Sequence, residues 1–297
     1  MNDVDVRTNS LKAWVLAARP KTLTAALIPV AVACAMAWDD GAFKLFPAAV
    51  CCVFAALMQI ASNLINDLYD FLKGSDREDR LGPKRAAAQG WITPKAMRIG
   101  IAVTIVLACL CGCMLVCSTG LWLVALGAAC VVFAFLYTTL LSYLGLGDLL
   151  VLVFFGLVPV TATYYIQTSC LGWQIWICAV ACGLLIDTLL VLNNFRDRDA
   201  DSISGKRTLV VKLGARFGKA LYLWLGIAAC VLVLSLALAG RYAAALLPLA
   251  YLWPHVSVWR TMARIDHGRE LNRVLGMTSR NMAIFALLLV VGLCLGI

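Results

Sequence analysis

Long apolar segments separated by short polar connections dominate this 297-residue chain. Each segment is continuous rather than alternating, and most are close to the ~20 residues that a helix needs to cross the hydrocarbon core. The pattern therefore predicts an all-α polytopic membrane protein with nine transmembrane helices in one domain, residues 1–297. The expected spans are Thr22–Trp38, Lys44–Ile65, Met97–Ser118, Leu121–Tyr137, Leu149–Ile166, Gly172–Leu192, Ala220–Ala239, Ala243–Trp259 and Asn281–Ile297.

Charge is distributed unequally between the two sides of these predicted spans. Only 14% of the residues are charged, against about 25% in a typical soluble domain. Of the 25 Lys and Arg residues, only Lys44 and Arg241 fall on the side opposite the N-terminus. The positive-inside rule predicts a multi-pass protein of the cytoplasmic (inner) membrane, with its N-terminus in the cytoplasm and its C-terminus outside. The net charge of +9 follows from this topology and does not indicate binding to nucleic acid.

Most of the 13 cysteines lie inside the apolar segments. Cys109, Cys113 and Cys117 recur at i, i+4 spacing and share one helix face, an arrangement compatible with a soft-metal site. The favoured interpretation is that they are small residues packed between helices. The pattern predicts no disulfide framework.

The two longest polar connections follow the second and the sixth predicted spans, and they resemble one another. Asn66–Asp70 leads to Gly74 in the first, and Asn194–Asp201 leads to Gly205 in the second. Such similarity suggests an internal duplication, a common way to form a membrane site between two halves.

Each connection places carboxylate and amide side chains on one face of a helix end. At about 100° per residue, the members of each cluster share a face, whereas Asp199 points to the opposite side and is assigned to solvent. The first cluster is Asn63, Asn66, Asp67 and Asp70, and the second is Asn193, Asn194, Asp197 and Asp201.

Carboxylate and amide oxygens are the ligands that Mg²⁺ prefers, and the ion usually completes its coordination with water and phosphate. The two clusters therefore predict Mg²⁺ on either side of a diphosphate; solvated helix ends without a ligand are the alternative interpretation. Among the neighbouring basic residues, we expect Arg85 and Lys206 to contact phosphate, and Asp70 and Asp197 to be essential for catalysis. The expected metal ligands are Asn63, Asn66, Asp67, Asp70, Asn193, Asp197 and Asp201.

The chain resembles the UbiA superfamily of intramembrane prenyltransferases in these paired Asp-rich motifs. Its finer motifs are similar to those of one branch, the 1,4-dihydroxy-2-naphthoate polyprenyltransferases (MenA type) of menaquinone synthesis. The motifs are Arg-Pro-Lys-Thr-Leu at 19–23, Gly74-x-Asp76, Gly145-Leu-Gly-Asp148, Phe154-Phe-Gly156, Asn193-Asn-x-Arg-Asp197 and Gly205-Lys-Arg-Thr208. The resemblance runs from about residue 18 to 215 and implies nine helices around a central cavity with a cytoplasmic cap.

Two departures from the wider superfamily bear on the site. Gly74 stands where the superfamily places a third aspartate, and the nearest acid is Asp76. Leu140 stands three residues after Tyr137, where the superfamily often has a lysine that contacts diphosphate. A lysine with that role must come from elsewhere in this chain.

Further substrate contacts are expected at a few polar positions near the motifs. Asp187 lies inside the sixth span, and an ionisable residue at membrane depth usually faces a cavity, although pairing with a neighbouring hydroxyl is the alternative. Asp148 begins the fifth span and is expected either to position the aromatic acceptor or to cap its helix. The remaining candidates are Lys21, Asp76, Tyr137 and Arg207.

The resemblance implies a reaction between a long polyprenyl diphosphate and 1,4-dihydroxy-2-naphthoate, with loss of diphosphate and carbon dioxide. Prenylation of another aromatic acid, such as a hydroxybenzoate or homogentisate, is the alternative within this class. A cation-coupled transporter is the alternative outside it, although transporters place such sites near the bilayer midplane. Prenyl chain length and oligomeric state stay open.

Overall fold

The described part of the chain consists of helices and their connections. The computed structural model describes residues 6–74 and 80–296, with residues 117 and 118 described by their backbone only. The elements are α1 (Leu11–Ala18), the 3₁₀ turn η1 (Pro20–Thr22), α2 (Leu23–Asp39), α3 (Leu45–Leu72), α4 (Pro94–Thr119), α5 (Trp122–Leu136), the π-helical η2 (Tyr137–Leu141), α6 (Ser142–Leu144), α7 (Gly147–Val151), the π-helical η3 (Leu152–Leu157), α8 (Val158–Thr168), α9 (Trp173–Ile203), α10 (Leu209–Leu234), the 3₁₀ segment η4 (Ser235–Ala239), α11 (Tyr242–Leu246), the 3₁₀ segment η5 (Leu247–Tyr251), α12 (Leu252–Ile265) and α13 (Leu271–Leu295).

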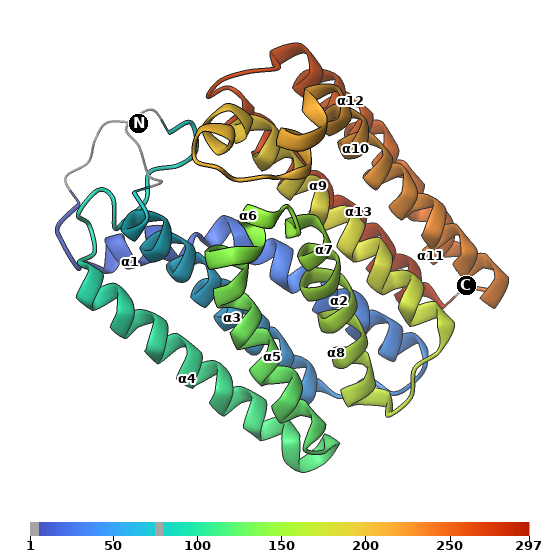
Figure 1. The fold of residues 1–297 in the computed structure, drawn as a ribbon. Helices are drawn as coiled ribbons and strands as arrows, with labels where there is room; N and C mark the ends of the chain where they lie inside the picture. The colour runs from blue at the N-terminus through green and yellow to red at the C-terminus, as the bar shows by residue number, and fades with distance from the viewer. Residues whose placement is uncertain (1–5, 75–79, 297) are drawn as a thin grey trace.

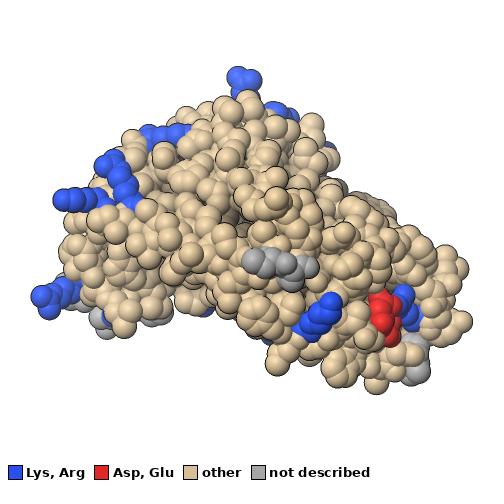
Figure 2. Space-filling model, turned by 90° about the horizontal axis from the view of Figure 1, so that it is seen from below, with Lys and Arg blue, Asp and Glu red and all other residues tan. Residues whose placement is uncertain are grey.

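Eight helical segments of the described chain are long and apolar enough to cross a membrane. They are Leu11–Asp39, Leu45–Leu72, Pro94–Val116, Trp122–Leu144, Gly147–Thr168, Trp173–Ile203, Leu209–Ala239 and Leu271–Leu295. The chain is thus an all-α polytopic membrane protein, as the apolar pattern predicted. One face of α4 carries a stripe of exposed apolar side chains, Ile99, Val103, Val106, Leu110 and Met114. Figure 2 shows a face of the molecule on which charged side chains occupy only isolated positions.

The expected span Ala243–Trp259 is not one continuous helix. This region is divided into α11, η5 and α12, and η5 begins beside Pro248. Proline has no N–H for the helical hydrogen bond, and its ring clashes with the carbonyl four residues earlier. The sequence pattern therefore identified the apolar segment but not its interruption.

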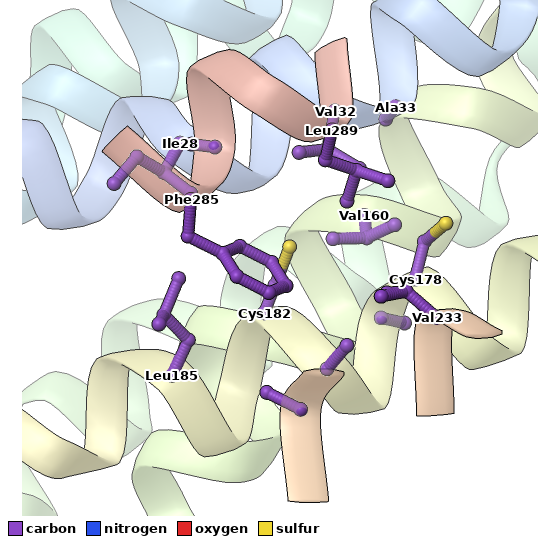
Figure 3. Close-up of a cluster of buried hydrophobic side chains, with 14 of the residues drawn as sticks. Ile28, Val32, Ala33, Val160, Cys178, Cys182, Leu185, Val233, Phe285 and Leu289 are labelled. Atoms are coloured by element: carbon purple, nitrogen blue, oxygen red, sulfur yellow. The ribbon is translucent and has the colours of Figure 1, made fainter. Parts of the chain in front are cut away.

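The main core lies where α9 meets α2, α10 and α13. Buried side chains from these helices interdigitate there, among them Ile28, Leu185, Val233 and Phe285 (Figure 3). The η3 turn approaches α9 so closely that a Cβ on Gly156 would lie 2.6 Å from the carbonyl oxygen of Ala179. Small residues at such a crossing let two membrane helices pack backbone to backbone.

The polar connections gather at one end of the bundle. In Figure 1, α1, the α9–α10 connection and the α12–α13 connection lie along the same edge, whereas α13 ends at the opposite edge. The two acidic motifs, 128 positions apart from Asn66 to Asn194, are thereby brought to one end of the molecule. The connections at this end also contain most of the Lys and Arg residues of the sequence.

Candidate active site

A cavity of about 460 Å³ opens between the ends of α3 and α9. Its polar end contains residues of both acidic motifs, and its deeper wall is apolar and aromatic. Among the deeper residues are Phe54, Met58, Phe133, Phe154 and Phe155. The cavity therefore has a charged mouth joined to an apolar interior, which suits an amphiphile with an anionic head and a hydrocarbon tail.

Two short π-helical turns shape this wall. The η2 turn carries Tyr137 and Thr138 into the cavity lining, and η3 contributes Phe154 and Phe155. A π turn inserts an extra residue into a helix and re-aims the side chains around it, and such turns are frequent at functional sites. Tyr137 thus lines the cavity, and its contact with substrate stays a prediction.

The first acidic motif is held by a loop that returns over the end of α3. Arg85 places Nη1 2.5 Å from Asp70 Oδ2, and the same nitrogen donates to the carbonyl of Asn66 at 2.7 Å. Asp70 and Arg85 are both buried, and both line the cavity. Thr138 donates a hydrogen bond to the Asn66 side-chain oxygen, which ties η2 to the same motif.

The second acidic motif faces the first from α9. Asp197 accepts two hydrogen bonds from Arg196, from Nε at 2.7 Å and from Nη2 at 2.5 Å. Arg196 also donates to Asn272 Oδ1 at 2.8 Å, so the start of α13 fixes its orientation. Asp197 and Asp201 line the cavity, whereas Asp199 is exposed on the other side of α9. The assignment of Asp199 to solvent is confirmed.

Lys206 lies between the two motifs. Its Nζ is 4.0 Å from Asp70 Oδ2 and 3.9 Å from Asp201 Oδ1. Gly205 makes this position accessible, because its φ of 77° ends α9 in a left-handed turn that sends Lys206 back over Asp201. Leu140 occupies the position where the wider superfamily often has a lysine that contacts diphosphate. Lys206 comes from elsewhere in the chain and lines the cavity.

Asp67 and Asn63, two predicted metal ligands, use their side-chain oxygens for hydrogen bonds within the chain, as Asn66 and Asp197 also do. Asp67 is 1% exposed, lies outside the cavity lining, and accepts backbone hydrogen bonds from Ala86 at 2.9 Å and Ala87 at 3.0 Å. Asn63 lines the cavity, but its Oδ1 accepts from Gln59 Nε2 at 3.2 Å. The helical spacing placed Asn63 correctly on the cavity face, but it did not show that Asp67 would face the returning loop instead.

Several predicted substrate contacts lie away from the cavity. Lys21 and Arg207 are exposed and do not line it. Asp148 and Asp187 are also outside the lining, and each has buried carboxylate oxygen without a hydrogen-bond partner in the described chain. Asp76 lies outside the described residues.

Three residues that line the cavity were not predicted as site residues from the sequence: Arg19, Thr22 and Gln59. A signal for Gln59 was present, because it precedes Asn63 by one helical turn and shares its face. Arg19 and Thr22 belong to the 19–23 motif, but there the prediction favoured Lys21.

The donor set fits Mg²⁺ completed by substrate rather than a closed protein cage. Asn66, Asp70, Asn193, Asp197 and Asp201 supply hard oxygen atoms around the polar end of the cavity. Across residues 6–74 and 80–296, no three carboxylate, His or Cys side chains converge on one point. Mg²⁺ commonly uses one or two carboxylates together with water and phosphate oxygens, so this arrangement suits it.

The chain is similar to known members of one protein family. The sequence model of the UbiA prenyltransferase family matches residues 26–279. The 1,4-dihydroxy-2-naphthoate octaprenyltransferase of Escherichia coli (strain K12) is 42% identical over 68% of this chain and 69% of its own length. The enzyme of the same name from Mycobacterium tuberculosis is 35% identical over 97% of this chain and 98% of its own.

Solved structures share the fold. A UbiA homologue from Aeropyrum pernix K1 superposes with a TM-score of 0.70 at 17% identity, over 90% of this chain and 97% of that one. A UbiA homologue from Archaeoglobus fulgidus bound to DMAPP and Mg²⁺ gives 0.65 at 14% identity, over 93% and 98%. These similarities establish the architecture.

Proposed function

This chain belongs to the UbiA prenyltransferase family, and we propose that it transfers a polyprenyl group from polyprenyl diphosphate to 1,4-dihydroxy-2-naphthoate. Diphosphate and carbon dioxide leave, and the product is demethylmenaquinone in its reduced, quinol form. The single observation that carries prenyl transfer is the placement of Asp70, Lys206 and Asp201 at the mouth of an apolar cavity. The choice of acceptor rests on relatives with that activity at 33–42% identity.

Mg²⁺ would be held by Asp70, Asp197 and Asp201, assisted by the amide oxygens of Asn66 and Asn193. When bound, it neutralises the diphosphate and the charge that develops on this leaving group. Arg85 and Arg196 keep two of the carboxylates oriented, since each makes a contact of 2.5 Å to its aspartate.

The chain's own residues supply the remaining parts of the mechanism. Lys206, between the two motifs, donates to the diphosphate as the C–O bond breaks and the electron pair moves to the leaving oxygen. The aromatic wall, including Phe154 and Phe155, holds the prenyl chain and keeps water from the allylic cation. The electron-rich naphthoate carbon that bears the carboxylate attacks this cation. Loss of carbon dioxide returns the C–C electron pair to the ring, so no covalent enzyme intermediate is required.

The proposed membrane topology has nine crossings, with the α11–α12 region as the eighth. It places the N-terminus and the active-site mouth in the cytoplasm and the C-terminus outside. The bias of Lys and Arg supports this orientation, because the active-site end carries nearly all of them. The prenyl diphosphate would then enter from the bilayer, with its head group at the cytoplasmic surface.

Carbon dioxide release separates this reaction from prenylation of a hydroxybenzoate, which keeps its carboxylate. Purified enzyme with Mg²⁺, prenyl diphosphate and carboxyl-labelled 1,4-dihydroxy-2-naphthoate is expected to release labelled carbon dioxide and diphosphate in a ratio near one to one. A prenylated product that retains the label would overturn the choice of reaction. Prenylation of hydroxybenzoate but not of naphthoate would assign the other acceptor class.

A further inference from the structure

One corner of the cavity, next to the first acidic motif, is lined by polar side chains that the proposed Mg²⁺ and diphosphate site does not use. We call Arg19, Thr22, Gln59 and Asn63 the polar corner; all four line the cavity. Asn63 precedes Asp70 by seven positions, so the corner is roughly 10 Å farther along α3 into the membrane. A diphosphate anchored at the motifs would direct its reactive carbon toward this depth.

A tight turn presents Arg19 to the cavity. Arg19 ends α1 with φ 50° and ψ 68°, in the left-handed region that residues other than glycine seldom adopt. The turn is closed by Thr22, which donates from Oγ1 to the Arg19 carbonyl at 2.9 Å. Residues kept in this conformation by their surroundings are concentrated at functional sites.

The orientation of the Gln59 amide follows from its neighbours. Asn63 Nδ2 donates to the Ala18 carbonyl at 2.9 Å, and a carbonyl can only accept. The Asn63 oxygen must therefore face Gln59 and accept from Gln59 Nε2 at 3.2 Å. Gln59 Oε1 is left buried, and it has no hydrogen-bond partner within the described residues.

The Arg19 guanidinium is also available to a ligand. Arg85, Arg196 and Lys206 each approach a carboxylate within 4.0 Å. In contrast, no hydrogen bond or ion pair joins the Arg19 guanidinium to any part of the chain that the structure describes. A cation and a hydrogen-bond acceptor without partners thus line the same corner, on either side of Thr22.

We propose that the polar corner recognises the aromatic acceptor as an ortho-hydroxy carboxylate. Arg19 donates to the carboxylate, and Gln59 Oε1 accepts from the hydroxyl on the adjacent ring carbon. The inference rests on the proposed function, and it names the residues that select 1,4-dihydroxy-2-naphthoate over para-hydroxybenzoate, whose hydroxyl lies opposite its carboxylate. Loss of carbon dioxide removes the anion that Arg19 binds, so the product has less affinity for the corner.

The experiment compares two competitive inhibitors, 1-hydroxy-2-naphthoate and 1-hydroxy-2-naphthamide, on the parent enzyme and on Arg19→Gln. Removing a charged hydrogen-bond donor should weaken the acid by roughly 10- to 100-fold and the amide by much less. The KM for prenyl diphosphate should stay within about twofold of the parent. Lys12→Gln removes the same charge from an exposed position of α1 and serves as the matched control.

Two further variants keep the test decisive if Arg19→Gln folds poorly. Arg19→Lys preserves the charge without the planar pair of donors, and it should recover part of the preference for the acid. Gln59→Met removes the acceptor oxygen at similar volume, so it should abolish the preference for a 1-hydroxy over a 1-methoxy naphthoate. Melting temperatures in detergent identify any variant that has lost its fold.

The acid-to-amide ratio is the inhibition constant of 1-hydroxy-2-naphthoate divided by that of 1-hydroxy-2-naphthamide. If Arg19→Gln leaves this ratio unchanged and raises the KM for prenyl diphosphate, Arg19 belongs to the diphosphate site and the inference is overturned. In that outcome the labelled carbon dioxide experiment would still support the proposed reaction. Retention of the label by the parent enzyme, with a collapsed acid-to-amide ratio in Arg19→Gln, would overturn the reaction and leave the binding inference standing.

Discussion

Asp67 and Asp70 belong to the same motif, yet the structure gives them different environments. Asp67 is buried with its carboxylate on the backbone N–H groups of Ala86 and Ala87. Asp70 lines the cavity and contacts Arg85 and Lys206. We therefore predict that Asp67→Asn impairs stability, whereas Asp70→Asn abolishes prenyl transfer in a folded protein.

The magnitude follows from the two hydrogen bonds of Asp67. A hydrogen bond to a charged group contributes about 1.5–3 kcal/mol, and a buried N–H left without a partner has its own cost. In Asp67→Asn one oxygen still accepts, but the amide NH₂ opposes the second backbone N–H. We expect a loss of about 2–4 kcal/mol, which corresponds to a fall of about 5–10 °C in melting temperature.

The assay combines thermal unfolding in detergent with activity measured over a range of Mg²⁺ concentrations. Asp67→Asn should melt earlier and keep the half-saturating Mg²⁺ concentration of the parent, with activity that recovers on cooling. Asp70→Asn should show no turnover at any Mg²⁺ concentration in a protein that still unfolds cooperatively, although its melting temperature should also fall because Arg85 loses its buried ion-pair partner. An Asp67→Asn protein with parental stability and a raised Mg²⁺ requirement would refute this assignment, and Asp67 would then be a metal ligand.

Two further predictions use matched pairs of residues. Asp197→Ala should abolish turnover, whereas Asp199→Ala should leave turnover almost unchanged because the Asp199 carboxylate is exposed on the far side of α9. Equal losses of turnover in the two variants would contradict the assignment of Asp197 and Asp199 to opposite faces of the helix. Tyr164→Phe should lower the melting temperature by a few °C without changing kcat, because Tyr164 donates to Asp40 Oδ2 at 2.6 Å far from the site. Tyr165→Phe is its control, and an equal effect of both changes would exclude the hydrogen bond as the cause.

Apolar length and the charge bias were sufficient to predict the helical class and the gathering of both acidic motifs at one end. These features depend on local composition, because a buried backbone must satisfy its hydrogen bonds within each span. The helix interruption near Pro248 could also have been predicted from the sequence, because a proline inside a helix removes a hydrogen bond. The π-helical turns η2 and η3 could not be predicted in this way, because they depend on packing rather than on local propensity: η3 lies against α9, and η2 lies against α3.

A helical wheel gives the direction of a side chain, whereas the role of that side chain depends on what covers it. The helical spacing places Asp67 and Asp70 on one face, but the returning loop gives them different partners. Its backbone N–H groups donate to the Asp67 carboxylate, and its Arg85 side chain contacts Asp70. The same reasoning applies one turn earlier, where Asn63 uses its oxygen to orient Gln59. The catalytic face of α3 therefore divides into carboxylates and amides that position the site and those that remain open to ligands. That division arises from long-range contacts, so one sequence could predict the face but not the separate roles of its residues.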